Sequence, residues 1–419
     1  MHHFSYINEI LHGEEVNLEE LAREVGTPTY VYSQATLMRH FKAFSQAFAH
    51  TDALVCYAVK ANTNRAVMAL FASLGGGADI VSGGELARAL AAGVPAERIV
   101  YSGVGKSEAE MEAALKAGIL MFNLESVQEL EVLDQVAGRL GLRAPVSFRV
   151  NPDVDANTHP KITTGLAKNK FGLDVDLALE QYQVAAGMPH LEVKGISCHI
   201  GSQLTEVRPF ADALERLARL VDRLRAMGLS PQLLDLGGGL GITYRDENPP
   251  QPAEYASALL ETAAGLGMRL VLEPGRVLVG NAGILLTRVL YTKTTPAKRF
   301  IVVDAAMNDL IRPSFYDSFH AIWPVAEHMG EENQVADVVG PICETGDFLA
   351  RDRRLPPFQR GDLMAVMSAG AYGFTMSSNY NSRPRAAEVM VSGDRWAVVR
   401  QRETIADLSR GESLPDWME

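Results

Sequence analysis

Short apolar runs alternate with helix-length segments between residues 53 and 273, and this alternation limits the folds open to the chain. The runs are rich in β-branched and aromatic residues, which is typical of buried strands. Strands that alternate with helices form a parallel sheet, and eight such units in about 220 residues indicate a closed (β/α)8 barrel. We expect strands at residues 53–60, 78–82, 98–102, 119–124, 146–150, 193–200, 233–236 and 269–273.

The structural alternative is an open, doubly wound sheet. That fold would carry a dinucleotide-binding fingerprint after its first strand, and residues 60–65 contain none. From about residue 280 the helical spacing stops, and short strand candidates separated by turn residues predict a mainly β second domain of the Greek-key or β-barrel type. The expected class is therefore α/β, with an N-terminal lead-in that packs on the β domain (1–30), a barrel (31–280) and the β domain (281–419).

Composition and charge narrow the possible partners and compartment. The chain of 419 residues carries a net charge of −12 and has no basic run, which argues against nucleic acid as a partner. Its three cysteines are far apart and show neither CxxC nor zinc-ligand spacing, so we expect no metal site and a reducing compartment. The N-terminus has no signal-peptide pattern, and no apolar run is long enough to cross a bilayer. We therefore expect a cytoplasmic protein that does not bind membranes.

Unusual residues follow the ends of several predicted strands, where the loops of a barrel form its active-site face. Lys60 ends the first strand, His199 the sixth, and Glu273 the eighth. A lysine at the end of a buried strand either snorkels to water or sits in a partly desolvated pocket as a Schiff-base nucleophile. The unusual residues at the ends of the other strands favour the Schiff-base alternative for Lys60.

The loop after the seventh strand, residues 237–241, contains four glycines in five positions. Glycines let backbone N–H groups approach and cradle a phosphate, although a tight strand-to-helix turn would need them too. Glu273 could form an internal ion pair with Arg276, or it could bond to a protonated heteroaromatic nitrogen. His199 could stack on a ring, fill the core or bind a metal, and the metal is disfavoured because no second ligand shares its local spacing. A lysine, a phosphate cradle and a carboxylate are together what pyridoxal phosphate requires.

A long connection, residues 151–172, follows the fifth strand. It contains His159, Thr163-Thr164-Gly165 and Lys170-Phe171-Gly172. Loops of this length inside a compact domain are usually functional, and a lid over the site is one such function.

Four segments, taken together, are similar to one enzyme family. They are Tyr57-Ala58-Val59-Lys60-Ala61-Asn62, His199-Ile200-Gly201-Ser202-Gln203, the glycine loop and Glu273-Pro274-Gly275-Arg276. In order and spacing, and over nearly the whole chain, they resemble the barrel-type (alanine-racemase-fold) pyridoxal phosphate-dependent decarboxylases. The resemblance implies that Lys60 holds the cofactor as a Schiff base, that His199 stacks on its ring and that Glu273 faces its pyridine nitrogen. It places Ser202, Gly239, Gly275 and Arg276 around the phosphate.

The second domain carries the resemblance that bears on specificity. Gly340–Asp347 resembles the family segment in which the cysteine, here Cys343, is the proton donor. Relatives that decarboxylate ornithine typically have Asp after that cysteine, whereas this chain has Glu344. Arg276, Arg312 and Tyr316 resemble a clamp for a distal substrate carboxylate, Glu344 would bind a distal ammonium, and Tyr372 resembles a tyrosine near the phosphate and the substrate. The plainer alternatives are that Cys343 fills the core and that Arg312 is a surface charge.

The resemblance implies a lyase that decarboxylates meso-2,6-diaminopimelate at its D-configured centre to L-lysine and carbon dioxide, the final step of lysine biosynthesis. It also implies a homodimer in which Cys343 and Glu344 act in the opposite subunit's site. Two alternatives remain. The first is a decarboxylase of another basic amino acid or of carboxynorspermidine on the same fold. The second is a non-catalytic cofactor carrier or degenerate homologue, but carriers of this fold lack the β domain, and a degenerate homologue should have lost Lys60 or Cys343.

Overall fold

The chain divides into two compact units. The computed structural model describes residues 2–154, 170–327 and 332–418. One unit comprises residues 38–278, and the other combines residues 1–37 with residues 279–419. We refer to them as the barrel unit and the β unit.

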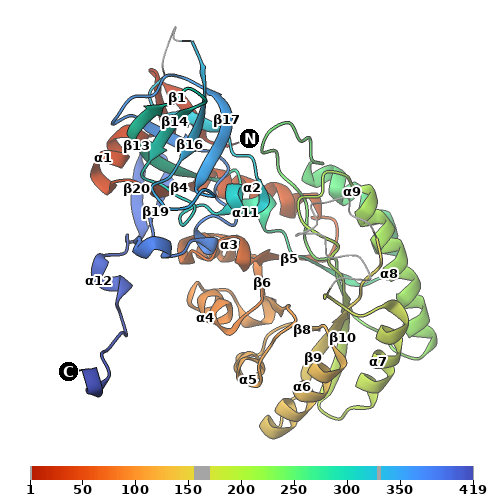
Figure 1. The fold of residues 1–419 in the computed structure, drawn as a ribbon. Coiled ribbons are helices and arrows are strands. Elements are labelled where there is room, and N and C mark those ends of the chain that lie inside the picture. The colour runs from red at the N-terminus through yellow and green to blue at the C-terminus, as the bar shows by residue number, and fades with distance from the viewer. Residues whose placement is uncertain (1, 155–169, 328–331, 419) are drawn as a thin grey trace. The chain divides into compact units, whose positions relative to one another are not determined.

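The barrel unit contains a closed, eight-stranded parallel barrel, which confirms the fold predicted for this part of the chain (Figure 1). The strands follow one another around the barrel in chain order, and β12 closes it by pairing with β5 through Leu270 and Ala53. Each predicted strand is present, within a few residues of its expected bounds. The bounds are β5 (Ala53–Ala58), β6 (Gly77–Ile80), β7 (Ile99–Tyr101), β8 (Met121–Leu124), β9 (Ala144–Arg149), β10 (Leu191–Ser197), β11 (Leu233–Asp235) and β12 (Arg269–Leu272).

Helices cover the outside of the barrel (Figure 1). Clear sequence signals set the ends of several of them. In α5, Ser107 and Glu110 form a reciprocal capping box, and Gly118 ends the helix in the left-handed conformation. In α8, apolar residues such as Leu217, Leu220 and Leu224 are buried at helical spacing. The helices are α2 (Gln34–Ala47), α3 (Arg65–Ser73), α4 (Gly83–Ala91), α5 (Glu108–Ala117), α6 (Val127–Leu140), α7 (Val175–Gly187), α8 (Arg208–Ala226), α9 (Pro252–Leu266) and α10 (Arg276–Val279).

The inside of the barrel has an apolar part and a polar part. Leu54, Cys56, Val100, Met121, Leu233 and Val271 form a buried apolar cluster. The polar part is a chain of hydrogen bonds: Ser147 Oγ donates to Asn123 Oδ1 at 2.6 Å, and Asn123 Nδ2 donates to Asp235 Oδ2 at 2.9 Å. Buried polar side chains cost stability unless they are bonded to one another, and these bonds meet that need inside the barrel.

A buried ion pair ties the loop after β7 to α6. Lys106 Nζ donates to Glu129 Oε1 at 2.6 Å and to the carbonyl oxygens of Gly103 and Asn123 at 2.8 and 2.7 Å. The other carboxylate oxygen, Glu129 Oε2, accepts the backbone N–H of Glu125 at 2.7 Å. These contacts compensate both buried charges and fix the loops at one end of the barrel.

The β unit is built on a sheet in which strands from both ends of the chain are neighbours. Its main path runs β17-β16-β14-β13-β4-β19-β20, with β18 paired to β13 and β15, and β1, β2 and β3 form a separate three-stranded sheet. The bounds are β1 (Phe4–Ile7), β2 (Ile10–Gly13), β3 (Val16–Asn17), β4 (Thr29–Ser33), β13 (Gly283–Thr294), β14 (Arg299–Val303), β15 (Ile322–Pro324), β16 (Gln334–Val339), β17 (Phe348–Leu355), β18 (Leu363–Val366), β19 (Ala387–Ser392) and β20 (Arg395–Arg400). The helices are α1 (Leu18–Val25), α11 (Arg312–Tyr316) and α12 (Ile405–Leu408).

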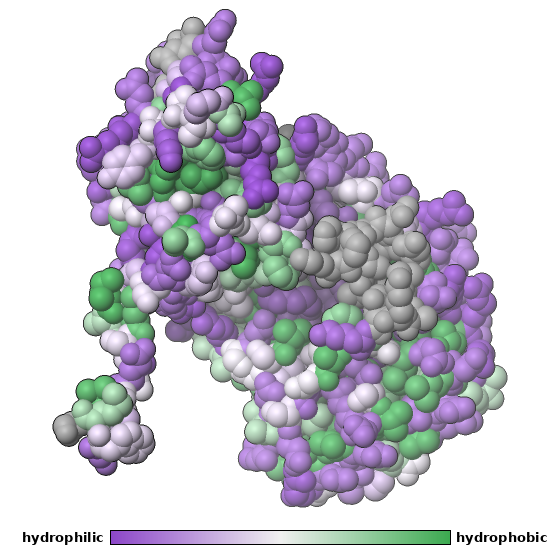
Figure 2. Space-filling model, viewed as in Figure 1, coloured by the Kyte–Doolittle hydropathy of each residue, from purple (hydrophilic) through white to green (hydrophobic). Residues whose placement is uncertain are grey.

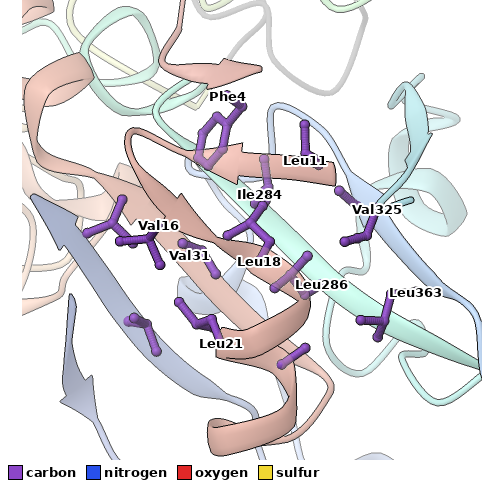
Figure 3. Packing of buried hydrophobic residues seen from close by; sticks show 14 of the residues in the cluster. Phe4, Leu11, Val16, Leu18, Leu21, Val31, Ile284, Leu286, Val325 and Leu363 are labelled. Carbon is purple, nitrogen blue, oxygen red and sulfur yellow. The ribbon is translucent and has the colours of Figure 1, made fainter. Parts of the chain in front are cut away.

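One core holds the N-terminal elements onto this sheet (Figure 3). Phe4, Leu11 and Leu18 from the first twenty residues pack with Ile284 of β13 and Val391 of β19. This shared apolar core packs the first twenty residues against β13 and β19.

The visible surface is largely hydrophilic, and hydrophobic residues gather on the C-terminal segment (Figure 2). The large apolar side chains of Ile405, Leu414, Trp417 and Met418 are mostly exposed, with Trp417 at 86%. Within the described part of the chain, no helix combines the length and hydropathy needed to span a membrane.

Candidate active site

Lys60 lies in a 3-10 turn, η1 (Val59–Ala61), directly after β5. Its Nζ donates to Asp79 Oδ2 on the neighbouring strand β6 at 2.9 Å. The lysine side chain is 35% exposed, whereas Asp79 is fully buried. The ammonium is therefore anchored at the carboxyl end of the barrel by a buried carboxylate, which differs from a lysine that snorkels into bulk water. Asp79 was not predicted, and its signal was a charged residue inside the apolar run Ala78-Asp79-Ile80.

Glu273 follows β12 and is buried beside a second carboxyl group, that of Asp235 at the end of β11. The two carboxyl groups hydrogen-bond to one another, and Ser102 Oγ donates to Glu273 Oε1 at 3.3 Å. Burial, and then the charge of Asp235, raise the pKa of Glu273 well above its usual range. Burial also raises the pKa of Asp235, to about 6. Asp235 was not predicted either, and like Asp79 it interrupts an apolar run, here Leu233-Leu234-Asp235-Leu236.

The glycine loop packs against the neighbouring strand ends so closely that side chains are excluded. A Cβ at Gly238 would lie 2.1 Å from the carbonyl oxygen of Glu273. A Cβ at Gly239 would lie 2.5 Å from the carbonyl oxygen of Gly201, and Gly239 has a φ of +116°. These glycines therefore serve a tight turn and let the backbone of this loop pack directly against the loops after β10 and β12.

Arg276 joins the loops after β10, β11 and β12. Its Nη2 donates to Ser202 Oγ at 3.0 Å, and its Nη1 donates to Tyr244 Oη at 2.7 Å. The arginine is buried, and Gly275 before it packs on Ala58, where an added Cβ would approach that side chain to 3.1 Å. A buried guanidinium, a hydroxyl and a glycine loop are the donor set that a phosphate group requires. Tyr244 is an addition to the predicted set.

His199 presents a neutral ring. Its Nδ1 accepts the backbone N–H of Gly238 at 3.1 Å, so the ring proton belongs on Nε2. Burial, together with the charges of Arg149 and Lys60, lowers the pKa of His199 well below its usual range. A neutral imidazole fixed through one nitrogen suits stacking better than acid–base work near neutral pH.

Cys343 lies in the loop that follows β16 in the β unit, and its side chain is exposed. The alternative that it fills the core is therefore wrong. Its backbone N–H donates to Asn381 Oδ1 at 3.2 Å. The buried carboxylate of Asp347 accepts the backbone N–H of Ile342 at 2.7 Å and that of Met307 at 2.7 Å, which fixes the loop around the cysteine.

Glu344 and Tyr372 also belong to the β unit. Tyr380 Oη donates to Glu344 Oε2 at 2.8 Å, and this contact raises the pKa of the Tyr380 phenol. Tyr372 is partly buried and has a φ of +55°. A positive φ is uncommon for a bulky residue, and such strain is concentrated at functional sites.

Arg312 begins the short helix α11 and is only 5% exposed, so the alternative of a surface charge is wrong. Its Nη1 contacts Nε2 of the fully buried His320 at 2.9 Å, and His320 Nδ1 contacts the carbonyl oxygen of Met367 at 2.8 Å. Because the carbonyl can only accept, Nδ1 carries the proton and Nε2 accepts from the arginine. Tyr316 ends the same helix and is partly buried. His320 was not predicted, since a lone histidine in the sequence carries no signal.

The long connection after β9 is described at its two ends. Residues 155–169, which include His159 and Thr163-Thr164-Gly165, lie outside the described residues. After them, Gly172 N–H donates to Glu125 Oε2 at 3.0 Å, and the Arg149 guanidinium lies 4.7 Å from the centre of the Phe171 ring. The hypothesis of a lid stays a prediction.

The barrel residues fit pyridoxal phosphate. In the closed barrel, β12 pairs with β5 and β11, and β11 pairs with β10. The lysine, the buried carboxyl group, the glycine loop and the Ser202–Arg276 pair therefore lie on the ends of four adjoining strands. This arrangement offers an amine, a partner for a ring nitrogen and a set of phosphate donors on one face.

Known proteins similar to this chain agree with that reading. The model of the pyridoxal-dependent decarboxylase family, pyridoxal binding domain, matches residues 34–280. The chain is 54% identical to the diaminopimelate decarboxylase of Vibrio cholerae, over 99% of each chain. It is 55% identical to that of Pseudomonas aeruginosa, over 98% of this chain and 99% of the relative.

Solved structures give the same result. The diaminopimelate decarboxylase of Helicobacter pylori in complex with L-lysine has a TM-score of 0.91 and 43% identity, over 94% of this chain and 98% of that one. The enzyme of M. jannaschii in complex with L-lysine has a TM-score of 0.95 and 38% identity, over 99% of each chain. Identity and coverage at this level, together with the strand-end residues above, show that the chain belongs to the diaminopimelate decarboxylases within the pyridoxal-dependent decarboxylase family.

Proposed function

We propose that the protein decarboxylates meso-2,6-diaminopimelate to L-lysine and carbon dioxide with pyridoxal phosphate as cofactor, the final step of lysine biosynthesis. The observation that carries the proposal is the convergence of Lys60, Glu273 and the Ser202–Arg276 pair on adjoining strand ends of the barrel. The family to which the chain belongs supplies the substrate.

Each barrel residue has a proposed role toward the cofactor. Lys60 would hold the cofactor through its side-chain amine. Ser202, Gly239, Gly275 and Arg276 bind the phosphate, and His199 packs its neutral ring against the cofactor ring. Glu273 binds the ring nitrogen. When bound, pyridoxal phosphate supplies a conjugated ring that takes up the electron pair left on Cα as carbon dioxide departs.

The β unit supplies the proposed acid and the proposed specificity. Cys343 Sγ–H gives a proton to Cα after carbon dioxide has left, and Tyr372 contacts the phosphate and the substrate. Arg312 and Tyr316, with Arg276, bind the distal carboxylate of diaminopimelate, and Glu344 binds its distal ammonium. His320 orients the Arg312 guanidinium without neutralising its charge, which suits an anionic ligand. Ornithine and lysine have no distal carboxylate and so offer this guanidinium no anionic group to bind.

We also propose a cytoplasmic homodimer in which Cys343 and Glu344 act in the partner's site. The exposed apolar side chains of the C-terminal segment support an interface between copies, because large apolar groups in contact with water favour association. The three cysteines are free thiols, which is typical of a reducing compartment.

A carbon dioxide release assay tests the function. The purified protein should release carbon dioxide from meso-diaminopimelate and form L-lysine, and it should lose this activity when pyridoxal phosphate is removed. Ornithine, lysine and carboxynorspermidine serve as competitors for the assignment. Turnover of any of them without turnover of diaminopimelate would overturn it.

A further inference from the structure

Three carboxyl groups lie close together inside the carboxyl end of the barrel. Asp79 bonds to Lys60 at 2.9 Å, whereas Asp235 and Glu273 bond to each other. Asp235 is fully buried and Glu273 is 7% exposed. The proposed function accounts for Glu273 and leaves the contact with Asp235 unexplained.

A hydrogen bond between two carboxyl groups requires a proton on one of them, because two carboxylates can only accept and repel each other. The surrounding contacts place the negative charge on Asp235. Its Oδ1 accepts the backbone N–H of Gly237 at 2.9 Å, and its Oδ2 accepts Asn123 Nδ2 at 2.9 Å. Glu273 receives the longer contact from Ser102, at 3.3 Å. N–H donors stabilise a carboxylate, so in the cofactor-free protein the proton belongs on Glu273.

The neighbouring groups agree with this placement. Lys60 and Asp79 are the other charged groups that face Glu273, and they bond to each other. The thiols of Cys56 and Cys198 lie near the carboxyl pair and stay neutral, because burial raises the pKa of each. Burial raises the pKa of both carboxyl groups, which agrees with a proton held by the pair.

We propose that Asp235 is a positioning residue that takes the proton from Glu273 when a cationic heteroaromatic nitrogen binds there. The inference rests on the proposed function in one respect, that Glu273 faces the ring nitrogen. In the transfer, the O–H bond of Glu273 breaks and an O–H bond on Asp235 forms, while the negative charge moves from Asp235 to Glu273. The pair keeps one proton throughout, so solvent neither supplies nor takes one.

The transfer explains why the second carboxyl group is useful. A lone ionised glutamate in this position would be a buried charge with nothing to balance it before the cofactor arrives. With Asp235, the charge rests on a group stabilised by two N–H donors and moves to Glu273 only when a cation balances it.

Isotope-edited infrared difference spectroscopy on the full chain tests this directly. Protein containing 13C-labelled glutamate or 13C-labelled aspartate is measured near neutral pH, first without cofactor and then loaded with pyridoxal phosphate. A carboxylic acid C=O band should shift with the glutamate label in the cofactor-free protein and with the aspartate label in the loaded protein. Loss of the band on loading, or no change in the label to which it responds, would overturn the proton transfer.

Two isosteric variants assign the band. Glu273→Gln should remove it from the cofactor-free protein, and Asp235→Asn should remove it from the loaded protein. Asp309→Asn, in the β unit, changes a different buried carboxyl group and should leave this band unchanged. A cofactor-free protein whose spectrum is the same with and without Glu273→Gln would show that the pair holds no proton on Glu273. These readouts need no turnover, so a failure of the diaminopimelate assay and a failure of the proton transfer can be told apart.

Discussion

The Arg312 guanidinium lies 2.9 Å from Nε2 of His320, and the histidine's other nitrogen is fixed 2.8 Å from the carbonyl oxygen of Met367. This chain of contacts sets both the tautomer of the histidine and the direction of the guanidinium. We expect no contact between His320 and the substrate. His320 nevertheless sets the direction in which Arg312 presents its guanidinium to a carboxylate.

Substitution of that histidine should therefore weaken substrate binding. His320→Leu removes the acceptor, and a hydrogen bond to a charged group contributes about 1.5–3 kcal/mol, so KM for diaminopimelate should rise roughly tenfold to a hundredfold. We expect kcat to change much less, because the chemistry at Cα is untouched. His50→Leu, at an exposed position, is the matched control. Steady-state kinetics decide the point, and a fall in kcat at constant KM would contradict it.

Lys60 should be essential both for the visible absorbance of the bound cofactor and for turnover. Lys60→Ala removes the only amine that the proposed function assigns to the cofactor, so the visible absorbance of the protein-bound cofactor and the activity should disappear together. Lys42→Ala, on the exposed face of α2, should retain both. Absorbance spectra and lysine formation are measured on the same samples. A Lys60→Ala protein that still decarboxylates would refute the assignment.

Substitution of Cys343 should lower turnover and leave cofactor binding intact. Cys343→Ala leaves the barrel residues intact, so the absorbance of the bound cofactor should persist. Loss of a general acid typically costs a hundredfold or more, and lysine formation should fall by roughly that factor. The exposed position of the thiol makes a folding defect an inadequate explanation for such a loss. Lysine production at the wild-type rate would exclude Cys343 as the proton donor.

The Lys106–Glu129 pair gives a stability prediction. Lys106→Met leaves the buried Glu129 carboxylate without its ammonium, and breaking a buried ion pair in this way typically costs about 3–5 kcal/mol. Lys116→Met, in an exposed pair on α5, should change little. Urea unfolding of the two variants and the wild type measures the difference. Equal midpoints for the two variants would show that the buried pair contributes no more than the exposed one.

Asp309 should make the stability of the β unit depend on pH. Burial raises the pKa of this carboxyl group from 3.8 to about 7. Because the folded state then binds the proton more tightly than the unfolded state, Asp309 makes folding less favourable as pH rises from about 4 to about 7. Asp309→Asn cannot ionise, so it should remove this loss and be more stable than the wild type at pH 8, by on the order of a few kcal/mol.

Unfolding midpoints at pH 4.5 and pH 8 measure the effect of Asp309. The difference between variant and wild type should be larger at pH 8 than at pH 4.5. Asp394→Asn, at an exposed position, should show no such change. A constant difference across the two pH values would mean that Asp309 is ionised throughout.

The barrel was predictable because each of its strands is a compact apolar run, and a parallel strand buried on both faces has this pattern. In the second domain the sequence predicts strands at residues 284–291, 299–304, 336–339, 363–367, 386–391 and 396–400, and it misses the edge strand β17 for the opposite reason. Its sequence, Phe348-Leu349-Ala350-Arg351-Asp352-Arg353-Arg354-Leu355, is dominated by charged residues because one side of the strand faces solvent. The hairpin β1–β2 was missed too, because its strands, Phe4–Ile7 and Ile10–Gly13, mix polar with apolar residues and form no compact apolar run.

In the site, the residues that could be predicted are those that directly follow a predicted strand of the barrel. Lys60, the glycine loop and Glu273 were of this kind, and the family resemblance assigned their roles. Asp79, Asp235 and His320 were not predicted, because their importance comes from a partner distant in sequence: Lys60, Glu273 and Arg312 respectively. Such pairings appear only when the barrel has closed or the sheet has formed.

The position of β4 in its sheet affects the order in which the parts of the β unit can fold during synthesis. Thr29 pairs with Ala387 of β19, and Gly283 of β13 pairs with Tyr32 on the other side. During synthesis, this early strand has no neighbour on either side until the whole barrel has left the ribosome, and it gains the second one only near the end of the chain. The slow step expected for so distant a pairing is the insertion of β4. A protein truncated before β19 would therefore leave one edge of β4 unpaired and prone to aggregation.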